Sequence, residues 1–517
     1  MANYVIKDGV GIIPEGTKTI EDSAFKSCEE LKSIVIPNSV KKIEFASFSG
    51  CTALTSIVIP DSVTEISAFA FKGCTGLTSI AMGNAVEKID YHAFSECAGL
   101  TDIVIPDSVK DVGDDAFSKC SALTSVAIGN SVTEIGMRAF EDCKALTSIS
   151  IGNSLAKCGK DAFRGCTSLT KIVVSEGNKV FDSRNNCNAI IETATNKMIV
   201  GCKNTIIVNS VKEIATEAFK ECDGLTHIDI PDSVTRIGDR AFRGCTGLTS
   251  IVIPDSVTEI GKCAYSGCTG LTSICVSDGN KKYDSRDNCN AIIETDTNIL
   301  IAGFKSTVIP DSVTVIGDHA FAECADLTTL DIPNSVTKID KSAFANCVRL
   351  SSIIIPDSVT EIQEDAFWDC KGLTSIVIPN SVTELGDNVF KGCTGLTNVD
   401  IPNSVTKLLD GTFSECSGLI SIVIPESATE MGVATFASCE GLKSVVIQGK
   451  LQKIDYNAFV DCIALETVTL PAGIGKIDKK AFSGCTALKT INVPAKKADY
   501  YKKRLPESLH SLIVELV

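Results

Sequence analysis

The sequence predicts a solenoid of about eighteen stacked coils, with a parallel β-sheet on one face and a cap at each end. Three observations predict it. A cysteine recurs every 23 residues, an aromatic residue stands three positions before each of these cysteines, and a leucine stands three positions after. A fixed period of ~20–50 residues is typical of solenoids, in which each coil has an apolar face that only its neighbours can cover. The column comprises Cys28, Cys51, Cys74, Cys97, Cys120, Cys143, Cys166, Cys222, Cys245, Cys268, Cys324, Cys347, Cys370, Cys393, Cys416, Cys439, Cys462 and Cys485.

Each coil begins with a short strand. In the coil L-T-S-I-V-I-P-D-S-V-T-E-I, residues 54–66, side chains alternate along the extended backbone. We therefore expect Leu54, Ile57 and Ile59 to point inward and Ser56 and Val58 to point outward. Stacked strands of this kind predict one parallel sheet.

The rest of the coil returns along the opposite wall. Pro60 ends the strand because proline has no backbone N–H to donate. Val63 and Ile66 then line the returning segment, and Phe71 fills the core. Because the aromatic residue recurs once per coil, we expect each ring to stack on the next, as core packing rather than as a cofactor site.

The L-x-x-I-x-I-P segment resembles the leucine-rich repeat signature, and the ending A-F-x-x-C-x-x-L is similar to that of the BspA-like leucine-rich repeat family of bacterial and protist surface proteins. The resemblance covers about 90% of the chain. It implies a leucine-rich repeat solenoid, either of the α/β type or mostly β. It also implies adhesion without catalysis, since such proteins typically attach to host matrix proteins or to other cells. Fold alone does not fix function.

The period divides the chain into a solenoid and two caps, which we expect to form one elongated body. Residues 1–30 hold an N-terminal cap, with a degenerate first coil over 4–25, and residues 31–494 form the solenoid. Residues 495–517 form a C-terminal cap, with helical spacing before Pro506 and strand-like spacing from Leu512 to Leu516. Its cationic residues suit either an anionic partner or a solvated face, which we favour: Lys496, Lys497, Lys502, Lys503 and Arg504.

Two similar insertions, near 175–205 and 277–307, interrupt the period. Their apolar runs flank Thr-Asn turns, so we expect a β-hairpin in each, pairing Ala189–Glu192 with Met198–Val200 in the first. A bridge between Cys187 and Cys202 is doubtful, since the second copy replaces one of them with Phe304.

Both insertions contain an Asp-Ser-Arg sequence, with Asp182 and Arg184 in the first and Asp284 and Arg286 in the second. These residues either tie down their own loop or bind a partner, because loops that interrupt a regular stack are candidates for recognition.

The column cysteines predict reduced, buried thiols. Adjacent coils lie ~4.8 Å apart and their in-register Cβ vectors run parallel, which keeps Cβ separations beyond the ~3.8 Å of a disulfide. Such thiols act as small apolar groups with a weak donor.

Composition excludes several functions. The net charge of −16 opposes binding to nucleic acid or anionic membranes. No stretch approaches the ~18 apolar residues of a membrane span. The isolated residues His92, His227, His319 and His510 form no metal-site or catalytic motif, so we expect no enzyme, no metal and no cofactor. Residues 1–30 lack a secretory leader pattern, which leaves a cytoplasmic protein or a secreted or surface protein whose leader was removed.

The outward middle-strand positions form a row with few charges, which we call the ribbon. Exposed apolar strips tend to mark interaction surfaces, although Val and Thr also favour strands in general. We predict a protein ligand, such as a host extracellular matrix protein, bound by a monomer; an intracellular scaffold or effector using the same face is the alternative. Candidate binding residues are Val252, Asp331, Ile354, Val377, Asp400 and Val423 on the ribbon, the outward-facing Trp368, and Arg184 and Arg286 in the insertions. The other ribbon positions are Val35, Val58, Ala81, Val104, Ala127, Ser150, Val173, Asp229, Cys275, Val446, Thr469 and Asn492.

Overall fold

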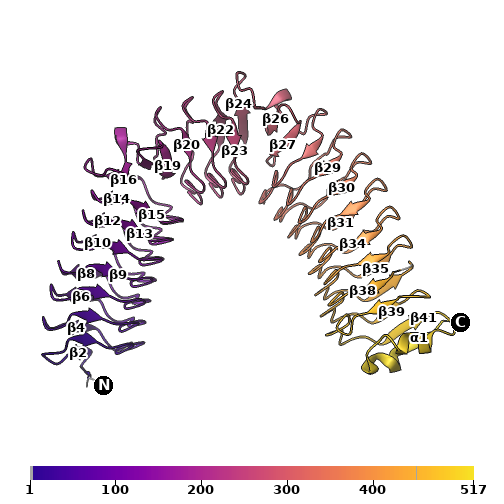
Figure 1. Cartoon of the computed structure of the whole chain (residues 1–517), viewed down its shortest axis with the longest axis horizontal. Coiled ribbons are helices and arrows are strands. Elements are labelled where there is room, and N and C mark those ends of the chain that lie inside the picture. Colours follow the sequence, from indigo (N-terminus) through magenta and orange to yellow (C-terminus); the bar gives the residue numbers. More distant parts are fainter. Residues whose placement is uncertain (1–3, 450, 517) are drawn as a thin grey trace. The chain divides into compact units, whose positions relative to one another are not determined.

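The computed structural model describes residues 4–449 and 451–516 of the 517-residue chain, so the outer ends of the predicted caps, residues 1–3 and 517, lie outside the described residues (Figure 1). Contacts group the chain into two compact units, residues 1–270 and 271–517, where the repeat alone predicts one body. Each unit is a stack of 23-residue coils, and the division falls inside a repeat rather than in a linker. In a solenoid each coil contacts only its neighbours, so sequence composition gives no sign of such a boundary.

The Leu-x-x-Ile-x-Ile segments form a first ladder of parallel strands. In β6 (Ser56–Ile59) the side chains of Ile57 and Ile59 are buried and Val58 is 65% exposed, which confirms the predicted alternation. Neighbouring strands pair in parallel with residues 23 apart in register, as in Val104↔Ala127. The strands of the first unit are β2 (Val10–Ile12), β4 (Ser33–Val35), β6, β8 (Ser79–Met82), β10 (Asp102–Ile105), β12 (Ser125–Ile128), β14 (Ser148–Ile151), β16 (Lys171–Val174) and β22 (Ser250–Ile253). Those of the second unit are β24 (Ser273–Val276), β31 (Ser375–Val377), β33 (Asn398–Asp400), β35 (Ser421–Ile424), β37 (Ser444–Ile447), β39 (Thr467–Thr469) and β41 (Thr490–Val493).

The expectation of a single parallel sheet needs correction, because a second parallel ladder runs along the returning wall. Its strands are two residues long, and β5 (Lys42–Ile43) pairs in register with β7 (Glu65–Ile66). It is continuous over seven strands in the first unit, whereas hydrogen bonds join the first ladder only in short groups. The strands of the first unit are β3 (Thr19–Ile20), β5, β7, β9 (Lys88–Ile89), β11 (Asp111–Val112), β13 (Glu134–Ile135), β15 (Lys157–Cys158), β20 (Glu213–Ile214), β21 (Arg236–Ile237) and β23 (Glu259–Ile260). Those of the second unit are β28 (Val315–Ile316), β29 (Lys338–Ile339), β30 (Glu361–Ile362), β32 (Glu384–Leu385), β34 (Lys407–Leu408), β36 (Glu430–Met431), β38 (Lys453–Ile454) and β40 (Lys476–Ile477).

A third set of hydrogen bonds joins the A-F turns, which we define as the segments from three residues before the core aromatic to the column cysteine. Phe48 N–H donates to the Ala70 carbonyl at 2.7 Å, and Gly50 N–H donates to the Lys72 carbonyl at 2.7 Å. In nearly every turn two positions adopt left-handed backbone, and many of them are not glycine: Lys119 has φ 60° and Asp142 has φ 57°. The stacked turns therefore satisfy their backbone donors without forming regular strands.

The core aromatics stack in a column, as predicted. Phe94, Phe117 and Phe140 are fully buried, with ring centroids 5.2 and 5.3 Å apart and planes within 8° of parallel. Aromatic rings favour such offset stacking over a direct sandwich. The column of the first unit stops at Phe163 and resumes at Phe219, on either side of the first insertion.

Most column cysteines donate a hydrogen bond to the backbone carbonyl of the core aromatic residue of the preceding coil, and Cys324, after the second insertion, donates to the Gly303 carbonyl instead. Cys120 Sγ donates to the Phe94 carbonyl at 3.2 Å, and that carbonyl also accepts the Cys97 N–H at 3.3 Å. The contact recurs at 3.0–3.2 Å along both units, and all 24 cysteines are free. Burial raises the pKa of the Cys416 thiol to about 12. A thiol is therefore both small enough for the core and able to satisfy a second lone pair of a buried carbonyl.

The insertions contain the predicted hairpins, but they are part of the stack. β18 (Ile190–Glu192) pairs antiparallel with β19 (Lys197–Val200), and β17 (Phe181–Asp182) adds a third strand. β19 then pairs in parallel with β20, so the hairpin supplies one rung of the second ladder. The second insertion repeats this with β25 (Tyr283–Asp284), β26 (Ile292–Glu294), β27 (Ile299–Ala302) and the 3-10 turn Arg286–Asn288, which matches Arg184–Asn186 in the first.

Both ends of the stack are covered. β1 (Val5–Lys7) pairs antiparallel with β2 at the N-terminal end. At the other end α1 (Ala498–Lys502), the only α-helix in the described chain, and the 3-10 helix Glu507–Leu512 lead into β42 (Ile513–Glu515), which pairs in parallel with β41. Tyr501 of α1 is fully buried, and its hydroxyl donates to the Pro471 carbonyl of the stack. The fold is thus mostly β, and the α/β alternative is not seen.

Replacing Phe117 by Ala removes a ring that is stacked on both sides, and we expect a loss of about 3–5 kcal/mol in the free energy of unfolding. Urea unfolding followed by circular dichroism measures the loss. Lys119→Ala, in the same turn, removes only exposed methylene groups and should change the stability by less than about 0.5 kcal/mol. Equal effects of the two substitutions would contradict the packing role of the column.

The column thiols should resist alkylation in the folded protein. With a pKa of about 12 for Cys416, only about one thiol in 10⁴ is ionised at pH 8. We expect iodoacetamide to modify the exposed Cys275 first and Cys416 only after denaturation, as followed by peptide mass spectrometry. Labelling of Cys416 at the rate of Cys275 would show that the column opens to solvent.

Candidate functional site

The ribbon faces solvent in both units, as the alternation predicts. In the first unit Val35 is 75% exposed and Val252 is 54% exposed. In the second unit Ile354 is 75%, Val377 73% and Val423 46% exposed. Asp331 and Asp400 are also exposed and lie at equivalent positions.

The ribbon includes residues that the repeat alignment missed. The inserted coils have their own outward positions, Ile206 and Val308, which are 62% and 71% exposed. The sequence could have revealed both positions, because each comes directly before a segment that resembles I-P-x-S-V. These segments are I-V-N-S-V after Ile206 and I-P-D-S-V after Val308. Strand register also extends the row into the caps, since Ile12 pairs with Val35 and Val514 pairs with Asn492.

A hollow interrupts the ribbon of the second unit beside two of its residues. It has a volume of about 350 Å³ and is lined by Val308, Leu330 and Asp331, among others. No strand hydrogen bonds join residues 307–309 to 329–330, which leaves space between these coils. The ribbon therefore has local relief next to Ile354.

Trp368 does not lie on the ribbon. It follows the core residue Phe367 within an A-F turn and is 37% exposed. Its carbonyl accepts the Asn346 N–H of the preceding turn. The tryptophan is outward-facing, as predicted, but it belongs to a different wall of the coil, which we call the turn face. It cannot act with the ribbon residues as one continuous patch.

The insertion arginines are engaged with their own modules. Arg184 Nε donates to Asp182 Oδ1 at 2.7 Å, and Arg184 Nη1 donates to Asn196 Oδ1 at 2.8 Å. Arg286 repeats both contacts, with Asp284 and Asn298. Burial would raise the pKa of Asp182, but the hydrogen bonds from Arg184 outweigh it and lower that pKa. This geometry supports the tie-down interpretation, and partner binding by these arginines stays a prediction.

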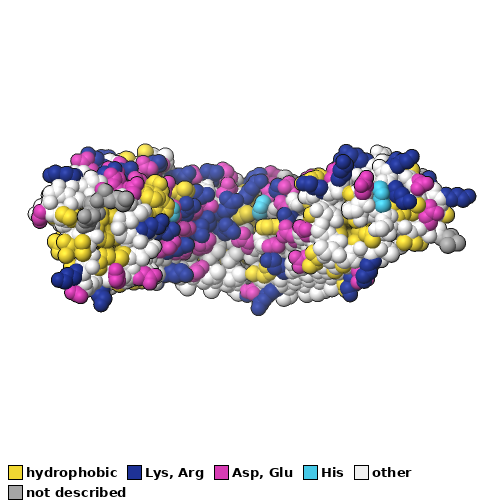
Figure 2. All heavy atoms as spheres, turned by 90° about the horizontal axis from the view of Figure 1, so that it is seen from below, with side chains coloured by type: hydrophobic (Ala, Val, Ile, Leu, Met, Phe, Trp, Pro, Cys, Tyr) yellow, Lys and Arg dark blue, Asp and Glu magenta, His cyan; other side chains and the backbone are white. Residues whose placement is uncertain are grey.

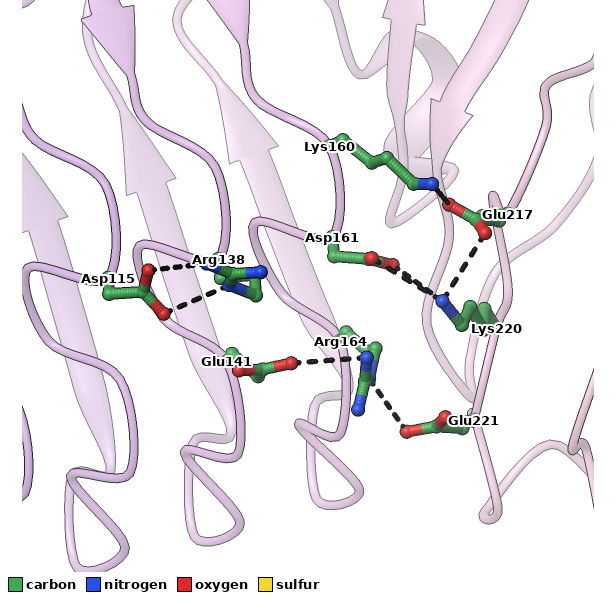
Figure 3. Close-up of polar contacts among 9 residues, drawn as sticks. All are labelled: Asp115, Arg138, Glu141, Lys160, Asp161, Arg164, Glu217, Lys220 and Glu221. Carbon is green, nitrogen blue, oxygen red and sulfur yellow. Dashed lines mark hydrogen bonds and ion pairs between the residues drawn. The ribbon is translucent and has the colours of Figure 1, made fainter. Parts of the chain in front are cut away.

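The turn face of the first unit carries a network of ion pairs that sequence reasoning missed (Figure 3). Asp115 accepts from Arg138 at 2.9 Å, and Glu141 pairs with Arg164 at 3.3 Å. In Figure 2, Lys and Arg side chains are interspersed with Asp and Glu over this unit, left of centre. The partners lie in successive coils, so no local motif reveals them.

Three of these pairs span the break in the aromatic column at the first insertion. Lys160 Nζ lies 3.1 Å from Glu217 Oε2, Lys220 Nζ lies 3.3 Å from Asp161 Oδ1, and Arg164 Nε lies 2.9 Å from Glu221 Oε2. They surround a cleft of about 370 Å³ between the rings of Phe163 and Phe219. The side chains of Lys220, Asp161 and Glu217 are less than 10% exposed.

The charges around this cleft largely compensate one another, so the cleft is held together by its own ion pairs. The pKa of Glu217 would rise through burial, but Lys160 and Lys220 lower it. Its ion pairs therefore stabilise the unit at neutral pH, and this stabilisation is lost as the pH falls through the lowered pKa. The sequence 102 residues further on has Cys263, Ser266 and Ala322 in place of Asp161, Arg164 and Lys220.

An aromatic cluster also lies on the turn face of the first unit. Phe69 packs edge-on against Phe45 and Tyr91, at 5.4 and 5.2 Å, and stacks on His92 at 4.9 Å. Lys72 Nζ lies 5.7 Å from the Phe69 ring centroid. Phe45 and Tyr91 remain more than 40% exposed. The four rings therefore bury part of their surface against one another.

The described residues show no cluster of three or more His, Cys, Asp or Glu placed to hold a metal ion. Nor does the described part of the chain contain a helix long and apolar enough to cross a membrane. His227 lies beside Asp229 on the ribbon, and His510 contacts the Leu505 carbonyl in the cap.

A family model of the BspA type leucine rich repeat region, six copies long, matches residues 11–123, 87–199, 190–295, 301–420 and 410–505. These matches together span most of the chain. The chain belongs to the BspA-type leucine-rich repeat family. The family description names a repeat region and no enzymatic activity. No curated protein matches the chain.

Several solved structures are similar to this family member. A leucine-rich repeat protein from Eubacterium ventriosum is 22% identical, with 76% of this chain and 85% of that chain covered and a TM-score of 0.45. One from Bacteroides ovatus is 22% identical, with 81% and 92% covered and a TM-score of 0.41. A leucine rich cell surface protein from Faecalibacterium prausnitzii is 23% identical, with 96% and 94% covered and a TM-score of 0.33.

Replacing Lys220 by Met leaves Asp161 and Glu217 with less cationic compensation in a buried site. We expect this to destabilise the first unit by about 3–5 kcal/mol, because breaking a buried pair leaves an uncompensated charge. Lys110→Met is the matched control, since Lys110 and its partner Glu87 are 60% and 57% exposed; it should cost less than about 1 kcal/mol.

The comparison is made by urea unfolding at pH 7. Hydrogen exchange then locates the change, which should be centred on residues 161–165 and 217–221. An effect of Lys220→Met no larger than that of Lys110→Met would show that the ion pairs do not hold the break together.

Proposed function

We propose that this chain is a noncatalytic protein-binding solenoid of the adhesin type, which binds host matrix proteins or other cells through the ribbon. The observation that carries the proposal is the exposure of aliphatic side chains at ribbon positions, such as Ile354 and Val377, at more than 70% each. Soluble proteins rarely expose contiguous apolar strips without an interaction to cover them.

The geometry suits a partner of ordinary size. Strands ~4.8 Å apart place the ribbon residues of successive coils close enough for one partner to contact several of them. A standard interface buries about 800 Å² on each partner. The carboxylates of Asp331 and Asp400, at equivalent positions, interrupt the aliphatic row and would select for complementary charge.

Adhesion is what the family resemblance implies, and an adhesin would act at the cell surface or outside the cell.

An intracellular scaffold or effector that uses the same ribbon is the second candidate. It is favoured by the 24 free cysteines, since reducing compartments maintain free thiols. Locating the protein in its producer, by fractionation with an antibody against the folded chain, separates the two. Surface exposure supports the adhesin, and retention in the cytosol supports the scaffold.

The double substitution Ile354→Glu and Val377→Glu places two charges in the middle of the ribbon. We expect binding to immobilised extracellular matrix proteins to weaken at least about tenfold, which corresponds to about 1.4 kcal/mol, because each carboxylate would be desolvated in the interface. Surface plasmon resonance measures the change, and circular dichroism verifies that the fold is retained.

The matched control is Thr360→Glu with Thr383→Glu, which adds the same charge at exposed positions next to the second ladder of the same coils. The control should bind as the wild type does. Equal affinity of both double variants would exclude the ribbon as the binding surface.

A further inference from the structure

The last coil and the C-terminal cap of the second unit form an open groove of about 750 Å³. Of the described residues that line it, Asp478 is the only carboxylate and Tyr456 the only aromatic residue. Lys and Arg side chains project at this end of the second unit, at the right of Figure 2. The cationic residues that line the groove are Lys476, Lys479, Lys480, Lys503 and Arg504.

The concentration of positive charge is unusual for this chain, whose net charge is −16. Elsewhere on the second ladder, lysines face carboxylates of the next coil: Lys407 Nζ lies 3.1 Å from Glu430 Oε1. At the C-terminal end Lys453 and Lys476 face each other in register, although like charges directly opposite are destabilising. Lys453 pairs with Asp455 of its own coil.

The lysines that line the groove are not held by ion pairs. Among residues 4–449 and 451–516, no carboxylate forms an ion pair with Lys476, Lys479, Lys480 or Lys503. Asp455 interacts with Lys476 through space, but these ammonium groups lack a direct carboxylate partner in the described chain, which leaves them available to an anionic ligand.

Arg504 is held in place while keeping donors available. Its Nε donates to the Gly475 carbonyl at 3.1 Å and its Nη1 donates to the Tyr500 carbonyl at 3.0 Å. The guanidinium also lies over the Tyr500 ring, 3.6 Å from the centroid. A guanidinium has five N–H donors, so these contacts fix its orientation without using its full capacity. A fixed guanidinium loses little entropy on binding an oxyanion.

Tyr456 gives the groove an apolar surface beside the cations. It is 42% exposed, and Lys480 Nζ lies 5.6 Å from its ring centroid. Tyrosine rings combine apolar faces with a polar tip, and the C–H face of a sugar ring can pack on such a surface while its anionic substituents meet the lysines.

We propose that this groove binds a short segment of a sulfated polysaccharide. The sulfate oxygens accept hydrogen bonds from the lysine ammonium groups and from Arg504, and one sugar ring packs against Tyr456. The groove volume lies within the ~300–1,000 Å³ typical of ligand sites. On a chain with a net charge of −16, a groove that gathers a few cations favours a short anionic segment over a long polynucleotide. This activity is additional to protein binding by the ribbon.

The test measures binding of a fluorescently labelled heparin hexasaccharide by anisotropy, between about 50 and about 200 mM salt. The variant Lys476→Gln, Lys480→Gln, Lys503→Gln should bind at least about tenfold more weakly and with a shallower salt dependence. The matched control is Lys18→Gln, Lys26→Gln, Lys32→Gln, which removes three exposed lysines of the first unit and should leave binding unchanged. A chemically desulfated hexasaccharide should not compete.

Three results would overturn the proposal. The first is equal binding of the hexasaccharide by the groove variant and the control variant. The second is competition by a hexaglutamate peptide, or by a single-stranded oligodeoxynucleotide of equal charge, that is as strong as competition by the hexasaccharide. The third is the absence of binding by the wild type at about 1 mM hexasaccharide, an affinity limit of about −4 kcal/mol.

Discussion

The structure depends on one constraint, the stacking of successive 23-residue coils in register. Within each uninterrupted run of coils this register aligns two strand ladders, the hydrogen bonds of the A-F turns and the aromatic column, with ring centroids 5.0–5.5 Å apart. The thiol hydrogen bonds depend on the same register, because the Cys120 thiol donates to the Phe94 carbonyl of the preceding coil. The insertions are tolerated because β19 and β27 each supply a rung of the second ladder. What they lack is an A-F turn, and in the first unit ion pairs such as Asp161–Lys220 span the resulting break.

Because the inward positions are committed to the core, only the outward positions are free to differ between coils. They form chemically distinct surfaces: an aliphatic ribbon, a charged and aromatic turn face in the first unit, and a basic groove at the end of the second. Trp368 lies on the turn face, so it cannot reinforce the ribbon. A regular scaffold of this kind lets one chain offer different chemistry on different walls without changing its core.

The repeat predicted burial well, because a period of 23 residues records which positions must face a neighbouring coil. The second ladder was missed because strands of two residues, such as Lys42–Ile43, have no pattern of their own. The left-handed positions were missed because residues such as Lys119 are not glycine. Ion pairs between residues 59 apart, such as Asp161 and Lys220, require the fold to be known. The ribbon could be placed from alternation alone, but its partner is not encoded in the periodicity.

Deleting part of the chain tests the stacking constraint most directly. Removing residues 104–126, one full period, joins Ile103 to Ala127 and preserves the register of all the ladders. We expect this variant to keep the circular dichroism spectrum of the wild type and a cooperative urea transition. Removing residues 104–115 instead leaves one coil too short and without its second-ladder strand β11, which interrupts the stack at that coil and should lower the midpoint and the cooperativity of the transition. Equal damage from the two deletions would contradict the account.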